Sequence, residues 1–350
     1  MRGRTGWGRT AMLAVAAALA VAAAAHAQQP AAGARTELVM SSWLPPRHPI
    51  VANAFQPWIE QIEAVTEGRV TVRLLARPLG SPPSHYYLAV DGIADLTYGL
   101  HSFTRDNRFP RSRFAQFSFI GDDAAAGSRA FWRVYTGRLD AQAEHEGVKL
   151  LGLFVHGPGI LYNNVRRIER PEDLAGLKIR TPGGYVADLM DGLGATTLFM
   201  DSGDVYQKLS RGVIDGLTMT YEATTAFRLT PHLRYAMRVP GGIYNTTWYV
   251  VANEAAWRKI STRDRAAIEA VSGEALAERV GRAWNDADTR AVEAIRAAGI
   301  DIYDAPPPML DAIRSLAQEH EARWTGRVAT RGYDGRAALA ALRSGTGAGR

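Results

Sequence analysis

The strongest signal in the chain is the run Pro171-Glu-Asp-Leu-Ala-Gly-Leu-Lys-Ile-Arg-Thr-Pro182. Its second half predicts a strand, and Gly183-Gly184 predict the turn into a helix. Arg180 then stands at the carboxyl end of the strand, where its guanidinium and the N–H groups of the helix start converge. Such a site suits an anion, a carboxylate in particular. The same spacing also fits an arginine that is solvated or that pairs with a neighbouring carboxylate.

Strand and helix patterns alternate on both sides of this run. This rhythm predicts an α/β protein with two small, doubly wound lobes. A β-rich run from Ile243 to Ala252 follows Gly241-Gly242, and its length predicts a hinge crossing between the lobes. The predicted strands cover residues 38–40, 70–74, 95–99, 148–154, 177–181, 196–200 and 217–219, and the predicted helices cover 50–66, 84–90, 124–142, 185–193 and 203–210.

The last third of the chain predicts long helices. Ser261-Thr-Arg-Asp264 has the composition of a helix cap, and apolar residues then recur every three to five positions up to Gly299. One helix of that length would exceed a small domain, so we expect it to brace both lobes. Prolines break the chain before a final helix over 309–328. We assign lobe I to 36–154 with 246–284, lobe II to 155–245 with 285–340, and a disordered tail to 341–350.

The first 27 residues read as a secretory signal peptide. Arg2, Arg4 and Arg9 precede an apolar run from Met12 to Ala25, and Ala25-His26-Ala27 has the small residues of a cleavage site. The apolar run is shorter than the roughly 20 residues that a spanning helix needs. We therefore expect a mature protein in the periplasm that does not itself span the membrane.

Composition narrows the possible chemistry further. The chain has no cysteine, which excludes disulfides, thiolate metal sites and cysteine nucleophiles. Without the three arginines of the leader, the formal charge falls from +6 to +3. The remaining arginines are dispersed and do not form a basic run with interleaved aromatics, so we expect no nucleic-acid partner.

Motifs of common enzymes are missing from the sequence. It contains no Gly-x-Ser-x-Gly, His-Glu-x-x-His, Walker-type or dinucleotide-binding glycine motif. His156-Gly-Pro-Gly159 is compatible with the oxyanion loop of an exported hydrolase, although a hinge or a close approach of backbone to a ligand explains it more simply. Glu144-His145-Glu146 and His320-Glu321 fit solvated helix faces, so we predict no metal and no cofactor.

Aromatic and polar residues recur where predicted strands end at their carboxyl side. Open α/β sheets bind ligands at this edge, so these side chains predict a cleft that stacks a small organic group. Ordinary core packing is the alternative for each of them taken singly. The residues in question are Trp43, His101, Phe103, Met219 and Tyr221.

Nearly the whole mature chain resembles the DctP-like family, the extracytoplasmic solute-binding proteins of tripartite ATP-independent periplasmic (TRAP) transporters. The resemblance is carried by Asp173-Leu-Ala-Gly-Leu-Lys-Ile-Arg-Thr-Pro182, Leu193-Gly-Ala195 and Asp204-Val-Tyr-Gln-Lys-Leu-Ser-Arg-Gly-Val-Ile-Asp-Gly216, in the family's order and spacing. It implies a periplasmic-binding-protein-like fold, with two doubly wound lobes joined by hinge strands and a long bracing helix. It also implies that Arg180 forms the ion pair with a ligand carboxylate.

From the resemblance and the residues together we expect a ligand-binding monomer without catalytic activity, which delivers a small organic acid to TRAP permease subunits. The same lobes could instead serve a ligand-sensing subunit of a signalling kinase. The family's second arginine and its asparagine after Asp-Gly are absent, which predicts a monocarboxylate with an apolar or aromatic group. Our predicted ligand-binding residues are Arg180, Trp43, His101, Phe103, His156, Gly183, Met219 and Tyr221.

Overall fold

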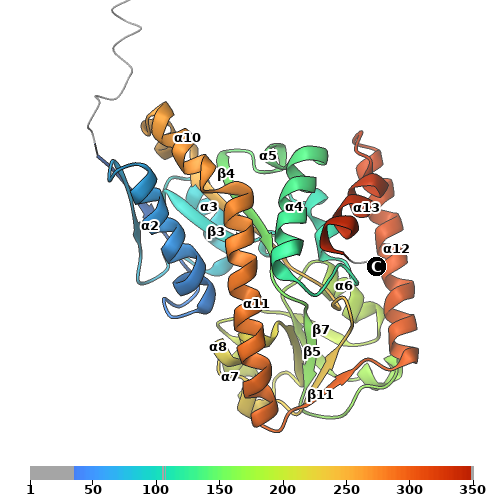
Figure 1. The fold of residues 1–350 in the computed structure, drawn as a ribbon. Coiled ribbons are helices and arrows are strands. Elements are labelled where there is room, and N and C mark those ends of the chain that lie inside the picture. Colours follow the sequence, from blue (N-terminus) through green and yellow to red (C-terminus); the bar gives the residue numbers. More distant parts are fainter. Residues whose placement is uncertain (1–34, 105, 107, 348–350) are drawn as a thin grey trace, which may run out of the picture.

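Two β-sheets organise the chain in the computed structural model, which describes residues 35–104, 106 and 108–347. The predicted signal peptide lies outside these residues. The upper part of Figure 1 contains the first sheet, and the lower part contains the second. The two doubly wound α/β lobes predicted from the sequence are confirmed.

The first sheet has five strands in the order β2-β1-β3-β10-β4. β1 runs parallel to β2 and β3, whereas β10 lies antiparallel between β3 and β4. Every residue of β10 is buried, which fits its apolar sequence and its central place. The strands are β1 (Thr36–Met40), β2 (Val70–Leu74), β3 (Leu96–Leu100), β4 (Val148–Val155) and β10 (Thr247–Asn253).

The second sheet has six strands in the order β11-β9-β5-β8-β6-β7. The strand of the opening motif, β6, is parallel to both of its neighbours, and β5 is antiparallel to β8 and β9. The carboxyl ends of β6 and β8 therefore share one edge. The strands are β5 (Ile160–Asn163), β6 (Lys178–Thr181), β7 (Thr196–Phe199), β8 (Gly216–Met219), β9 (Tyr235–Arg238) and β11 (Asp301–Asp304).

Helices cover both sheets and connect them (Figure 1). Asp123 begins α4 by accepting hydrogen bonds from two backbone N–H groups, and prolines begin α12, where a missing N–H costs nothing. The helices are α2 (Gln56–Val65), α3 (His85–Val90), α4 (Ala124–Arg138), α5 (Ala141–Glu144), α6 (Tyr185–Gly192), α7 (Val205–Ser210), α8 (Tyr221–Ala226), α9 (Glu254–Lys259), α10 (Thr262–Ala270), α11 (Gly273–Ala297), α12 (Pro307–Ala329) and α13 (Gly335–Thr346).

The bracing helix is confirmed, but the prediction that one helix runs from Ser261 to Gly299 is wrong. The chain breaks between α10 and α11, where Gly273 adopts a left-handed φ of +57°. A side chain at this position would come within 2.8 Å of the Trp132 ring. From there α11 passes along α4 and β4 of the first lobe and reaches α8 of the second. Figure 1 shows it running down the molecule across both parts.

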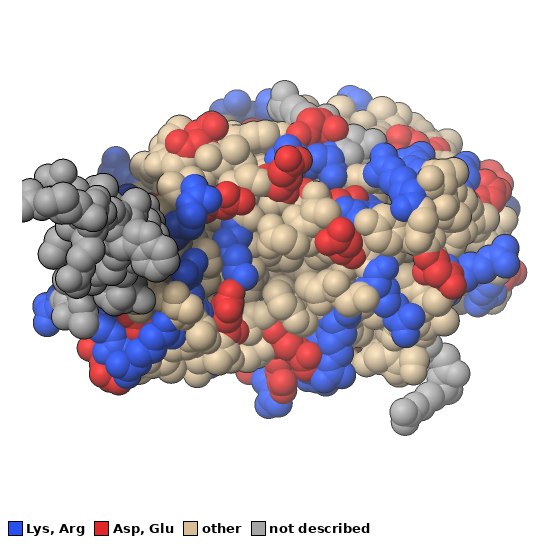
Figure 2. Space-filling view, turned by 90° about the horizontal axis from the view of Figure 1, so that it is seen from above, with Lys and Arg blue, Asp and Glu red and all other residues tan. Residues whose placement is uncertain are grey.

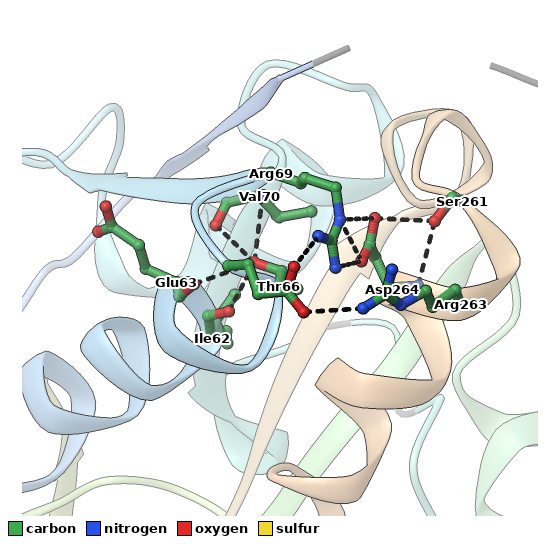
Figure 3. Close-up of polar contacts among 9 residues, drawn as sticks. Ile62, Glu63, Thr66, Arg69, Val70, Ser261, Arg263 and Asp264 are labelled. Atoms are coloured by element: carbon green, nitrogen blue, oxygen red, sulfur yellow. Dashed lines mark hydrogen bonds and ion pairs between the residues drawn. The ribbon is translucent and has the colours of Figure 1, made fainter. Parts of the chain in front are cut away.

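The predicted cap at Ser261 is also present and belongs to a polar cluster (Figure 3). Ser261 Oγ accepts a hydrogen bond from the backbone N–H of Asp264 at 3.1 Å. The Asp264 carboxylate accepts hydrogen bonds from Nε and Nη2 of Arg69, at 3.0 and 2.8 Å. These contacts attach α10 to the loop between α2 and β2.

The C-terminal helix α13 extends into the segment predicted to be a disordered tail. Its buried Leu339 and Leu342 pack the helix against α4, and Gly345 lies so close to Ala130 that an added Cβ would come within 2.7 Å. This return to the first lobe is a tertiary contact that a glycine-rich composition does not reveal. Residues 348–350 lie outside the described part of the chain.

The surface charges are mixed in sign. Lys and Arg alternate with Asp and Glu across the face that Figure 2 shows, which agrees with the dispersed arginines of the sequence. Within residues 35–104, 106 and 108–347, no helix combines the length and the apolar character needed to cross a membrane.

Candidate functional site

Arg180 is a buried cation at the carboxyl end of β6. Only 2% of its surface is exposed, and its guanidinium donates to two backbone carbonyls, Met200 O at 2.8 Å and Thr218 O at 3.1 Å. Among the described residues no carboxylate forms an ion pair with it. Burial lowers the pKa of Arg180 to about 10, against smaller opposing effects of Tyr244 and Asp201. The side chain therefore stays charged at neutral pH and lacks a full counter-charge within the described chain.

This guanidinium lines a cavity whose walls are largely aromatic. Trp43 and Trp248 stack with centroids 5.5 Å apart and planes 7° apart, and Phe103 lies 5.9 Å from Trp43. A flat apolar group can pack against such walls while a carboxylate reaches the arginine. The aromatic lining residues are Trp43, Phe103, Phe227, Tyr244, Trp248 and Trp284.

The cavity lies where both sheets present the carboxyl ends of parallel strands. Trp43 follows β1, Phe103 follows β3, Arg180 stands on β6 and Met219 ends β8. Strand edges of this kind are where open α/β sheets bind ligands. The two lobes thus contribute opposite walls, and α11 adds Trp284 from the side.

Five of the sequence-predicted residues line this one cavity: Arg180, Trp43, Phe103, His156 and Met219. The other three, His101, Gly183 and Tyr221, lie outside it. Gly183 follows Pro182, which lines the cavity, and its left-handed φ of +76° serves the turn into α6. Tyr221 begins α8 and borders a separate groove beside Asp288.

His101 turns away from the cavity although Phe103, two residues later, lines it. Its Nε2 lies 3.1 Å from Nε2 of His145, and its ring packs edge-on against Phe109. Burial, followed by the neighbouring His145, lowers the pKa of His101 well below its usual range. The 3₁₀ turn His101–Phe103 sends the two side chains to different places, so His101 belongs to the packing of its own lobe.

His156 lines the cavity with both ring nitrogens already engaged. Its Nε2 accepts from the backbone N–H of Thr246 at 3.0 Å, so Nδ1 carries the proton and donates to the carbonyl of Gly157. Burial lowers its pKa to about 4, which keeps the ring neutral at physiological pH. The ring is therefore a fixed wall between the strands of the predicted hinge, and no nitrogen is left to accept a proton from a nucleophile.

Glu222 and His48 also line the cavity, although neither is among our predicted ligand-binding residues. Glu222 is 4% exposed, and its Oε1 accepts from Trp284 Nε1 at 2.8 Å and from Thr220 Oγ1 at 3.2 Å. Its Oε2 lies 3.6 Å from Nε2 of His48. Glu222 lies in the first turn of α8, three residues after the end of β8, and this place near a strand end is a signal in the sequence, whereas nothing local marks His48.

A second carboxyl group lies behind Glu222. Asp288 of α11 accepts a hydrogen bond at Oδ1 from the backbone N–H of Glu222, at 2.8 Å. Burial, and then the charge of Glu222, raises the pKa of Asp288 well above its usual range. Through this hydrogen bond Asp288 fixes the start of α8 against the bracing helix.

Trp248 and Trp284 were also missed, because their positions depend on long-range pairing. Trp248 is opposite Leu100 in β3 and Phe154 in β4, a register that the sequence does not specify.

A metal site would need several ligating side chains close together. The described residues contain no cluster of three or more His, Asp or Glu side chains arranged to hold an ion.

Known proteins share this architecture. A solved TRAP periplasmic solute-binding protein from Bordetella bronchiseptica, with bound (R)- and (S)-mandelate, is 37% identical, with a TM-score of 0.86 over 89% of this chain and 98% of the other. A marine-metagenome TRAP solute-binding protein specific for aromatic acid ligands, in complex with metahydroxyphenylacetate, is 27% identical, with a TM-score of 0.82 over 89% and 99%.

Sequence comparison agrees with these structures. The outer membrane transporter protein TsaT of Comamonas testosteroni is 29% identical over 305 residues, which cover 86% of this chain and 89% of TsaT. Residues 40–325 match the model of the DctP family, described as bacterial extracellular solute-binding protein, family 7. Together with the two-lobed fold, this match shows that the chain belongs to the DctP family of TRAP solute-binding proteins.

Proposed function

We propose that the protein captures a small aromatic monocarboxylate between its lobes and delivers it to the membrane subunits of a TRAP permease. The observation that carries this proposal is Arg180, a buried cation with no ion-pair partner among the described residues, set in an aromatic cavity. A ligand carboxylate would supply the missing counter-charge. A dicarboxylate would bring a second charge that no other basic side chain of the cavity could pair, apart from a protonated histidine.

The structural neighbours support an aromatic ligand. Two of them hold mandelate and metahydroxyphenylacetate, each of which combines one carboxylate with one ring. Trp43 and Trp248 stack on each other in this cavity, and such a ring could pack against the aromatic surface that they add to its wall. Closure would bend the chain near 154–159 and 241–253, where β4 leads to β5 and the chain returns through β10.

The proposal also covers the export, localisation and oligomeric state of the protein. Residues 1–27 would direct export and be cleaved, and the mature chain would act as a periplasmic monomer without turnover of its ligand.

The engaged nitrogens of His156 argue against the alternative of an exported hydrolase, because a general base needs one of them free. Deletion of the gene should abolish uptake of the ligand; a lost transcriptional response with normal uptake would instead favour a sensing subunit.

Binding can be tested directly by calorimetry and thermal shift on the purified mature protein. We expect benzoate, phenylacetate or mandelate to raise the Tm by mass action, whereas the matching amides and C4-dicarboxylates should not. Stabilisation by neutral sugars or dicarboxylates alone would refute the aromatic monocarboxylate. Mass spectrometry of the small molecules that co-purify with the protein would then identify the ligand itself.

A further inference from the structure

The wall of the cavity contains a buried carboxylate oxygen without a hydrogen-bond donor. Oε2 of Glu222 has no partner among the described residues, although Oε1 of the same group has two. Leaving a buried acceptor unsatisfied is costly, and native structures contain few of them. This oxygen belongs to a residue that lines the cavity, so a bound ligand could satisfy it.

A hydrogen-bond donor lies opposite the same oxygen. Nδ1 of His48 accepts from the backbone N–H of Ile50 at 3.3 Å, which places the ring proton on Nε2. Burial lowers the pKa of His48, with Glu222 opposing, so the ring is neutral at physiological pH. Nε2 and Glu222 Oε2 are 3.6 Å apart, which is too far for a hydrogen bond between them. His48 also lines the cavity.

Both groups are held in place before any ligand binds. Trp284 and Thr220 fix the Glu222 carboxylate, and the backbone of Glu222 is bound to Asp288. His48 is buried, and Phe227 packs against its ring with centroids 5.9 Å apart. A fixed donor and a fixed acceptor that face one region of a cavity are suited to a group that both accepts and donates.

We propose that the ligand is a hydroxylated aromatic acid, an inference that rests on the proposed function. Its hydroxyl oxygen accepts from His48 Nε2–H, and its hydroxyl proton is donated to Glu222 Oε2. An ammonium group has no lone pair for His48, and a carbonyl or ether has no proton for Glu222. A hydroxyl group satisfies both, while Arg180, which lines the same cavity, takes the carboxylate.

The first experiment compares ligands that share one skeleton. Isothermal titration calorimetry at pH 7.5 would use phenylacetate as the parent, mandelate and 3-hydroxyphenylacetate as its hydroxylated forms, and phenylglycine as the ammonium form. We expect at least one hydroxy acid to bind about tenfold or more tightly than phenylacetate, because a hydrogen bond to a charged group is worth at least that. Phenylglycine should bind no more tightly than the parent.

The second experiment removes the proposed contacts. Glu222→Gln keeps an oxygen for Trp284 but can present a donor in place of Oε2, and His48→Asn shortens the opposing side chain. In each variant, the Kd of the hydroxy acid should be lower than that of phenylacetate by about threefold or less, whatever the affinity for phenylacetate itself. Glu60→Gln, an exposed charge change on α2, is the matched control and should keep the full advantage. Thermal unfolding without ligand checks that each variant is folded.

Three outcomes would overturn the inference in distinguishable ways. If phenylacetate binds but neither hydroxy acid binds more tightly, the ligand has no hydroxyl at this place and the proposed function survives. A hydroxy-acid advantage that persists in both variants would place the hydroxyl contact elsewhere. If no aromatic acid binds the wild-type protein at all, the proposed function fails, and the hydroxyl contact with it.

Discussion

Replacing Arg180 by methionine should separate ligand affinity from the stability of the protein. Methionine has a similar length but no charge, so it removes the ion pair with the ligand while filling most of the same space. A ligand carboxylate buried without its cation is expected to lose about 2–5 kcal/mol of binding free energy. This loss corresponds to a Kd that is about 30-fold to 5,000-fold weaker.

The stability of the ligand-free protein should change far less. Burial lowers the pKa of Arg180 to about 10, and at 1.36 kcal/mol for each pKa step below its ordinary value the charged side chain costs the fold about 3 kcal/mol at neutral pH. Methionine removes this cost but leaves the carbonyls of Met200 and Thr218 without these donors, a loss of about 1–3 kcal/mol. The two effects offset, so the free energy of unfolding should change by less than about 2 kcal/mol.

Calorimetry with the best aromatic acid and urea denaturation without ligand measure the two quantities separately. Arg211→Met, which removes an exposed arginine in the same lobe, is the matched control and should bind normally. Arg180→Lys should recover only part of the affinity, because an ammonium cannot reproduce the planar fork. Binding by Arg180→Met as tight as that of the wild type would refute the role of this guanidinium.

Three further substitutions test the surroundings of the site. Asp288→Asn should raise the free energy of unfolding by about 1–3 kcal/mol at pH 7.5. Because the pKa of Asp288 is raised in the folded state, the native protein loses stability as the pH rises above about 4, and the substitution removes this loss. The gain should therefore vanish near pH 4 in urea titrations, and a gain independent of pH would contradict this reasoning. Gly159→Ala would place a Cβ 2.0 Å from the ring of Tyr244, so it should displace this cavity wall and weaken ligand binding by calorimetry; unchanged affinity would show that the wall is dispensable. Asp264→Asn should lower the Tm by several degrees at pH 7, since hydrogen bonds from Arg69 lower the pKa of Asp264; its effect should shrink as the pH falls below about 4, and an equal effect at pH 3 would exclude the charge as the cause.

The sequence by itself was sufficient for many of the elements and for the position of Arg180 at the end of a strand. The strand before Arg180, the glycine turn after it and the cap at Ser261 are local patterns, and local backbone preferences and periodicity are enough to produce them. The parallel rhythm of strands also predicted that Trp43, Phe103 and Met219 lie near one another, and all three line the cavity, because the carboxyl ends of parallel strands meet at one edge.

Only the tertiary structure decided which side chains complete the cavity. Trp248 reaches it because β10 inserts antiparallel between β3 and β4, and His48 faces Glu222 across a cavity built from both lobes. His101 turned inward although it sits at the predicted edge. Strand register, side-chain rotamers and contacts between the lobes depend on packing among residues far apart in the chain. A short stretch of sequence does not contain the partners of that packing, so it cannot determine them.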